Sequence, residues 1–191
     1  SSSNLTITQC NINGAPWGMY IGERQQGRPN AIITNNKLSN QYTTGILCFG
    51  CANSIIANNS VNNAYNHGID VRFNQGSGVT VYNNTISGAK EGIYLLHSSG
   101  HKVYGNIISN SKISSVTCYG SGNEYIFDNT FIKSRIAIML GGGYYNVTIG
   151  KNTFKPDKLT FPPTFEHYLV KSENRYYDKI GAKIIGTYSD S

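Results

Sequence analysis

An asparagine that recurs at one position of a repeated pattern constrains the fold more than any other feature of the chain. Aligning the repeats places six asparagines in a single column, with Cys10 at the same position in the first repeat. The column contains Asn36, Asn59, Asn84, Asn106, Asn129 and Asn152. These members follow one another at intervals of 22 to 25 residues, which is within the range typical of solenoid repeats. The chain therefore reads as a stack of similar units.

Two apolar columns flank the asparagines at fixed distances. Three residues before the Asn column lie Ile7, Ile33, Ile56, Val81, Val103, Ile126 and Ile149. Two residues after it lie Ile12, Leu38, Val61, Ile86, Ile108, Phe131 and Phe154. Each unit thus has a short strand, a turn containing the asparagine and a second short strand.

A third strand follows in most units and is often introduced by glycine. It reads GMYI from Gly18, GILC from Gly45, GIDV from Gly68, GIYL from Gly92, SVTC from Ser115 and AIML from Ala137. Apolar residues alternate with a variable middle residue, as in a half-buried strand, and no unit has room for a helix of about ten residues. The composition agrees. The low share of charged residues, 14%, argues against a helical protein, and the hydrophobic share of 39% argues against disorder.

These units predict an all-β fold, a right-handed single-stranded parallel β-helix of about seven coils with an internal Asn ladder. The coils cover residues 1–154. Residues 155–191 contain Pro156, Pro162 and Pro163 and break the pattern, so we expect them to cap the last coil or to pack along its side. At the other end we expect either further coils before Ser1 or an end-to-end partner.

The repeat consensus, apolar-x-x-Asn-x-apolar followed by Gly-Ile-x-apolar, resembles that of the pectin-lyase-like superfamily. It is most similar to the carbohydrate-binding and sugar-hydrolase branch, which includes NosD-like proteins, mannuronan C5-epimerases and the disaggregatases of methanogenic archaea. The resemblance covers residues 5–154. It implies a parallel β-helix that acts on or binds carbohydrate, and it leaves the activity open because one fold hosts many chemistries.

Ionisable side chains gather on the outer side of the Gly-led strands between residues 67 and 101. Alternation places Asp70 and Tyr94 next to each other on adjacent coils, and neighbouring positions add further acids, bases and cations. We expect the catalytic residues to be Asp70, Tyr94, Glu91 and His67, and the substrate-binding residues to be Arg72, His97, Tyr20, Glu23 and Arg24. His101, at a strand start, is expected to be structural, and Glu124 and Asp128 to lie in turns. The alternative is an ordinary polar face of a solenoid, in which Asp70 and Arg72 form a surface pair.

The segment YNHGIDVR, residues 65–72, is similar to the Tyr-Gly-x-Asp-Pro-His region of mannuronan epimerases. It departs from that motif at Val71, which replaces the proline, and at Arg72, which replaces the histidine. The local histidine is instead His67, upstream of Asp70. An unchanged epimerase mechanism is therefore not implied.

Several reactions fit this inventory, and we expect an enzyme that cleaves a polysaccharide. A glycoside hydrolase would need a pair of carboxylates, such as Asp70 with Glu91 or Glu23. A polysaccharide lyase or a C5-epimerase would need a base, such as Tyr94 or His67, and a cation that holds the uronate carboxylate, such as Arg72 or Arg24. The rival from another class is a non-catalytic carbohydrate-binding or surface-structural β-helix.

The charge of +6 and the pI near 9.1 favour an anionic polysaccharide as partner, with outward aromatics such as Trp17, Tyr42 and Tyr65 stacking on sugar rings. We expect no nucleic-acid partner, no membrane span, no cofactor and no metal site. The four cysteines, including the pair in CFGC from Cys48, are expected to be free thiols. The predicted location is secreted or on the cell surface.

Overall fold

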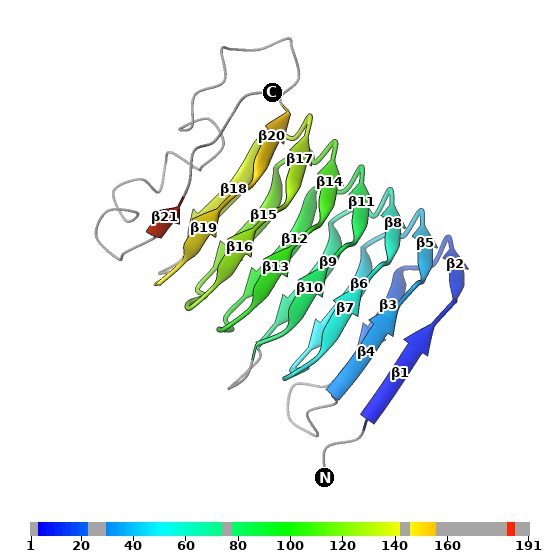
Figure 1. Ribbon diagram of the computed structural model, residues 1–191. Helices are drawn as coiled ribbons and strands as arrows, with labels where there is room; N and C mark the ends of the chain where they lie inside the picture. The colour runs from blue at the N-terminus through cyan, green and yellow to red at the C-terminus, as the bar shows by residue number, and fades with distance from the viewer. Residues whose placement is uncertain (1–3, 23–29, 74–77, 142–145, 156–182, 186–191) are drawn as a thin grey trace.

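The computed structural model describes residues 4–22, 30–73, 78–141, 146–155 and 183–185. Within these ranges the chain forms three parallel sheets, and successive strands of each sheet come from successive coils (Figure 1). The described residues contain strands and turns and no helix. The predicted fold class, an all-β right-handed parallel β-helix, is confirmed.

Three parallel sheets, A, B and C, run along the solenoid. Sheet A consists of β1 (Asn4–Thr8), β4 (Asn30–Thr34), β7 (Ile55–Ala57), β10 (Thr80–Tyr82), β13 (Lys102–Tyr104), β16 (Tyr125–Phe127), β19 (Thr148–Gly150) and β21 (Lys183–Ile185). Sheet B consists of β2 (Asn11–Asn13), β5 (Lys37–Ser39), β8 (Ser60–Asn62), β11 (Thr85–Ser87), β14 (Ile107–Ser109), β17 (Thr130–Ile132) and β20 (Thr153–Lys155). Sheet C consists of β3 (Trp17–Ile21), β6 (Thr44–Phe49), β9 (His67–Arg72), β12 (Glu91–Leu96), β15 (Ser114–Tyr119) and β18 (Ile136–Gly141).

The core is built from the apolar columns that the repeat defines. Ile33, Ile56, Val81, Val103, Ile126 and Ile149 stack inside sheet A and are fully buried. Leu38, Val61, Ile86, Ile108 and Phe131 do the same inside sheet B, with at most 2% of each residue exposed. Because no single coil could enclose these side chains, the stacking of neighbours is what stabilises the fold.

The predicted Asn ladder fills the turn between sheets A and B. The side-chain oxygen of Asn59 accepts from the backbone N–H of Asn36 at 3.0 Å and from the Asn36 amide at 2.9 Å. The same two bonds recur from coil to coil up to Asn152. The ladder therefore satisfies backbone donors that the tight turn would otherwise bury without partners.

Glycine is the second residue of β3, β6, β9 and β12 in sheet C, where consecutive coils approach closely. A Cβ atom on Gly45 would lie 2.5 Å from the carbonyl oxygen of Gly68 and 2.5 Å from the Val61 side chain. Gly68 meets the carbonyl of Gly92 and the Ile86 side chain in the same way. The glycine column thus lets sheet C pack against sheet B, and it brings the outer positions of β9 and β12 side by side.

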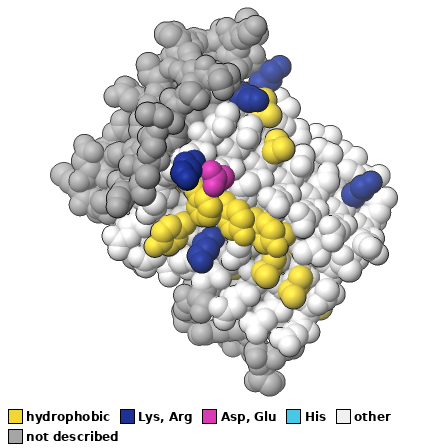
Figure 2. Space-filling view, in the orientation of Figure 1, with side chains coloured by type: hydrophobic (Ala, Val, Ile, Leu, Met, Phe, Trp, Pro, Cys, Tyr) yellow, Lys and Arg dark blue, Asp and Glu magenta, His cyan; other side chains and the backbone are white. Residues whose placement is uncertain are grey.

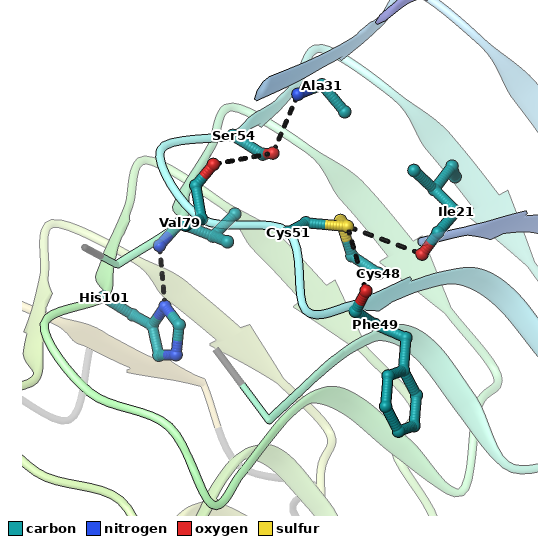
Figure 3. The surroundings of a disulfide bond; sticks show 9 residues. Ile21, Ala31, Cys48, Phe49, Cys51, Ser54, Val79 and His101 are labelled. Carbon is teal, nitrogen blue, oxygen red and sulfur yellow. Dashed lines mark hydrogen bonds between the residues drawn. A yellow bond between two sulfur atoms is a disulfide. The ribbon is translucent and has the colours of Figure 1, made fainter. Parts of the chain in front are cut away.

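One expectation about the cysteines is wrong. Cys48, in β6, and Cys51, in the turn that follows, form a disulfide with Cα atoms 5.6 Å apart (Figure 3). The turn after β6 folds back far enough to bring the two thiols together, which the spacing alone did not establish. Cys10 and Cys118 are free, as predicted.

The outer face of sheet A carries stacked aromatic rings. Tyr82 and Tyr104 are stacked with ring centroids 5.1 Å apart, and Tyr104 and Phe127 follow at 5.0 Å, with the ring planes of each pair nearly parallel. Figure 2 shows a band of apolar side chains on this face. These rings form a ladder that stabilises neighbouring coils from the outside.

Of the predicted C-terminal segment, residues 155–191, the structure describes Lys155 and β21. The β21 strand pairs in parallel with β19 and so adds a strand to sheet A at its C-terminal edge. The division of the chain at residue 154 stays a prediction.

Candidate functional site

The candidate site lies on the outer face of sheet C, where β9 and β12 run side by side. Ile69 and Val71 belong to the core, so the alternation of the strand turns Asp70 to the opposite face. Tyr94 is the register partner of Asp70, as the repeat alignment predicted, and Glu91 is the partner of His67. Four of the expected side chains therefore share one patch across two coils.

His67 lies between two carboxylates that come from different coils. Its Nε2 is 3.1 Å from Oε2 of Glu91. Its Nδ1 is 2.8 Å from Oδ2 of Asp70, which is an ion-pair distance. The geometry of this contact is not that of an aligned hydrogen bond. About 14% of the His67 side chain and 13% of the Glu91 side chain are exposed. The pair therefore borders solvent and can be reached by a ligand.

Asp70 lies beneath this pair and has no exposed surface. Arg72 donates from Nε to Oδ1 of Asp70 at 2.7 Å and from Nη2 to Oδ2, which makes a two-point contact. The guanidinium also lies over the Tyr94 ring, 5.7 Å from its centroid. Asp70 thus holds His67 and Arg72 in place, while about 30% of the Arg72 side chain stays exposed.

Tyr94 covers the flat face of His67. The two rings are nearly parallel, with centroids 4.6 Å apart. Because Arg72 contacts the same phenol ring, Tyr94 lies at the centre of a cluster that has two carboxylates, an imidazole and a guanidinium around it. We call Asp70, Tyr94, Glu91, His67 and Arg72 the sheet C cluster.

The charges of the cluster shift the pKa values of its members. Burial lowers the pKa of His67, but the close contacts with the carboxylates of Asp70 and Glu91, and their charges, outweigh it, so this pKa lies above its usual 6.5. Burial raises the pKa of Glu91, and bonds from His67 and Thr117 outweigh that effect, so this pKa lies below 4.5. Burial and the charge of Glu91 raise the pKa of Tyr94, which therefore stays a neutral phenol at neutral pH.

Two further residues hold the cluster, and neither was selected from the sequence. Thr117 donates to Oε1 of Glu91 at 2.8 Å, and Ser114 is hydrogen-bonded to Thr117. Thr117 occupies the outer column next to Tyr94, one coil further on. The sequence signal for Thr117 was its place in the same outer column as Asp70 and Tyr94, because a polar residue in that column lies next to the cluster.

Of the other expected substrate-binding residues, His97 and Tyr20 pack against aromatic rings outside the cluster. His97 is exposed and belongs to a row of rings, between Phe73 at 5.4 Å and Tyr119 at 6.2 Å. Tyr20 is 56% exposed on β3 and packs edge-on against Trp17. Leu47 separates Tyr20 from Asp70 in the register. Glu23 and Arg24 lie outside the described residues.

A second polar group is buried between sheets C and A, where Glu124 lies in the turn between β15 and β16, as expected. Oε2 of Glu124 accepts from the backbone N–H of His101 at 2.8 Å. Nδ1 of His101 in turn accepts from the backbone N–H of Val79 at 2.8 Å (Figure 3). Both side chains are fully buried. Burial raises the pKa of Glu124 to about 9 and lowers that of His101 to about 4, so both are uncharged at neutral pH. His101 is therefore structural, as expected.

The described residues contain no group of three or more His, Cys, Asp or Glu side chains arranged to hold a metal ion. They also contain no helix with the length and apolar character to cross a membrane.

The stacked sheets and their ladder define a right-handed parallel β-helix, a fold that supports a carbohydrate-related or surface β-helix protein. The chain belongs to the family described as the right-handed beta helix region, whose sequence profile matches residues 1–132. Comparison with curated proteins and with solved structures finds no further relative. The pectin-lyase-like branch is thus a finer assignment than the family match supports.

Chemically, the sheet C cluster can transfer a proton and hold an anion. His67, whose pKa is raised by the two carboxylates that flank it, can exchange a proton with a bound ligand. A neutral phenol beside it can donate a proton. Arg72 has exposed surface with which to contact a carboxylate, although Asp70 holds one edge of its guanidinium.

Proposed function

We propose that the protein is a carbohydrate-active enzyme that removes the C5 proton from a uronate residue of an acidic polysaccharide. One observation carries the proposal: the His67 ring lies between the carboxylates of Asp70 and Glu91 and against the phenol of Tyr94. A base oriented by a carboxylate and adjacent to an acid is the arrangement that proton transfer requires. The family match supports the carbohydrate context but does not by itself identify a reaction.

The proposed step begins from the neutral His67 that carries its proton on Nδ1, toward Asp70, with a uronate carboxylate held by Arg72 and C5 in place of Glu91 at the unprotonated Nε2. Nε2 then takes the C5 proton, and the electron pair of that bond forms the C4–C5 double bond. The bond between C4 and the glycosidic oxygen breaks, and Tyr94 gives its proton to that oxygen. This sequence is the β-elimination of a polysaccharide lyase, and reprotonation of C5 from the opposite face would instead give an epimerase.

Hydrolysis fits the cluster less well. A glycosidase needs one carboxyl group that is protonated at neutral pH to donate to the leaving oxygen. Glu91 accepts from His67 and Thr117 and has a lowered pKa, and Asp70 accepts two bonds from Arg72. Both groups are thus held as acceptors, which favours a base mechanism over general acid catalysis by a carboxyl group.

A second candidate, carbohydrate binding without catalysis, is favoured by a different observation. Asp70 has no exposed surface and both of its oxygens are engaged. Because the Asp70 carboxylate cannot reach a ligand, the cluster also fits a network whose role is only to hold the two coils together. Activity measurements separate the two functions.

The test incubates the protein with a linear polyuronate and with a neutral glucan. Absorbance of unsaturated uronate detects elimination, and reducing ends detect any cleavage. We expect unsaturated product from the polyuronate alone, and a loss of roughly 100-fold or more in Asp70→Asn because His67 and Arg72 lose their orienting group. Asp128→Asn, an exposed turn position, is the matched control. Full activity in Asp70→Asn, or binding without any product, would reject the catalytic proposal.

The location that we propose is outside the cell or on its surface. The Cys48–Cys51 disulfide supports it, because disulfides persist mainly in oxidising compartments. An acidic polysaccharide substrate agrees with the same location.

A further inference from the structure

A single row of exposed side chains follows the turn between sheets B and C along the solenoid axis. The row consists of Tyr42, Tyr65, Lys90, Lys112 and Arg135, each four residues after the core residue of the preceding sheet B strand. Backbone bonds keep these turns in register: Tyr65 donates to Gln41, Lys112 to Ala89 and Arg135 to Ser111. At about 4.8 Å per coil the row extends for roughly 19 Å.

The cationic half of the row forms no ion pair within the described residues, although Lys90 is close enough to Glu91 to help lower the pKa of that carboxyl. The ion pairs within the described ranges all belong to His67 and Arg72, so Lys90, Lys112 and Arg135 have none there. Glu91 follows Lys90 directly but bonds to His67 and Thr117 on the sheet C side. Three evenly spaced positive charges therefore face solvent and favour an anion with repeating charges.

The aromatic half of the row borders a groove. Tyr42 is 67% exposed and Tyr65 is 66% exposed, on adjacent coils. Both line an open groove of about 560 Å³ together with Asn63, Asn110 and Lys112. Flat apolar rings beside amide groups can contact both the faces and the hydroxyl groups of sugars.

The row also adjoins the sheet C cluster. Tyr65 precedes His67 by two residues, and Lys90 directly precedes Glu91 at the start of β12. A polymer that lies along the row would therefore pass the edge of sheet C at which His67 and Glu91 lie. Binding and proton transfer could then act on the same chain.

We propose that this row is a binding track for a linear anionic polysaccharide, which lies parallel to the solenoid axis with its sugars on Tyr42 and Tyr65 and its charges on Lys90, Lys112 and Arg135. The inference rests on the proposed function for its substrate class, but the track and the cluster use different residues. Repeating carboxylates or sulfates match the spacing of the cations, because each coil presents one side chain.

The first test removes the charges of the track. Lys90→Gln/Lys112→Gln/Arg135→Gln is compared with a control of equal net charge, Lys37→Gln/Lys102→Gln/Lys151→Gln, which changes exposed lysines away from the row. Calorimetry measures binding of a polyuronate chain at several salt concentrations. We expect roughly 100-fold weaker binding for the track variant at low salt, about fivefold per cation, and a shallower salt dependence. The control should bind as the natural sequence does.

The second test removes the aromatic rings. Tyr42→Ser/Tyr65→Ser should weaken binding at every salt concentration and leave the salt dependence unchanged, because stacking involves no ion release. Neutral glucan and single-stranded RNA serve as competing ligands. Equal losses in the track and control variants, unchanged affinity in both track variants, no polyuronate binding by the natural sequence, or equally tight RNA binding would overturn the proposal.

A third variant separates this inference from the proposed function. His67→Gln alters the cluster and leaves the row unchanged, so we expect it to bind polyuronate as tightly as the natural sequence. Tight binding without product in His67→Gln is the result that both proposals predict, whereas tight binding without product by the natural sequence would leave the track in place and reject catalysis. Loss of binding in His67→Gln would instead assign ligand recognition to the cluster and overturn the track.

Discussion

His67 and Glu91, 24 residues apart in the chain, face each other across adjacent coils with Nε2 and Oε2 3.1 Å apart. The contact exists because β9 and β12 pair in register and both residues begin their strands. It couples the titration of an imidazole to that of a carboxylate, and the first two predictions follow from this coupling.

Glu91→Gln should lower the pKa of His67. Burial alone lowers this pKa, and the substitution removes one of the two carboxylates that raise it. Imidazole resonances followed by NMR across the pH range measure the change, and His67→Gln assigns the signal. Thr117→Val keeps both carboxylates and should shift the pKa far less. An unchanged His67 pKa in Glu91→Gln would show that the two side chains do not interact in solution.

The same pair should stabilise the fold within a limited pH window. The raised pKa of His67 contributes stability that is complete below 6.5 and is lost as pH rises through the folded value. The lowered pKa of Glu91 contributes stability that is complete above 4.5 and is lost as pH falls through the folded value. The free energy of unfolding of the natural protein, minus that of His67→Gln/Glu91→Gln, should therefore be greatest between pH 4.5 and 6.5 and smaller on either side. A difference that is flat with pH contradicts this.

Glu124→Gln should stabilise the protein at neutral pH. The pKa of Glu124 is about 9 in the fold and 4.5 in the free side chain, so its contribution is complete below 4.5 and is lost as pH rises toward 9. At pH 7 the buried acid costs on the order of 3 kcal/mol relative to an uncharged group. Urea unfolding at several pH values should show a gain that disappears near pH 4.5. Asp128→Asn, at an exposed position, should show none.

Asn84→Leu should be strongly destabilising. The Asn84 side chain accepts from both donors of Asn59 and donates to Ile56, Tyr82 and Asn106. Removing it leaves at least two buried groups without partners, at a cost of about 3–5 kcal/mol. Thermal and chemical unfolding measure the loss. Asn62→Leu makes the same change at an exposed position of β8 and should alter stability by less than about 0.5 kcal/mol. Equal losses in both variants would reject the importance of the ladder.

The fold was largely predictable because its repeat fixes the register. Once the Asn column aligns the coils, the neighbours of each outer residue follow, and Asp70 beside Tyr94 is one such consequence. The direction of each side chain does not follow. The sequence placed Asp70 and Glu91 in the same region, but it could not show that His67 lies between their carboxylates.

Two other features had no reliable signal. Glutamate is rarely buried without a charged partner, so the sequence did not show that Glu124, in its turn, is buried as the acceptor for the backbone N–H of His101. Cys48 and Cys51 are close in sequence, yet only the turn after β6 determines that their Cα atoms come within 5.6 Å.

Exchange of the C5 proton with solvent tests the central claim most directly. A polyuronate is incubated with the protein in D₂O, and NMR and absorbance follow deuterium at C5 and unsaturated product. We predict that the natural protein produces one or the other, that His67→Gln slows it by about 100-fold or more, and that His97→Gln, in the neighbouring ring row, does not. No exchange and no unsaturated product with the natural protein, or full activity in His67→Gln, would contradict the assignment of proton transfer to the sheet C cluster.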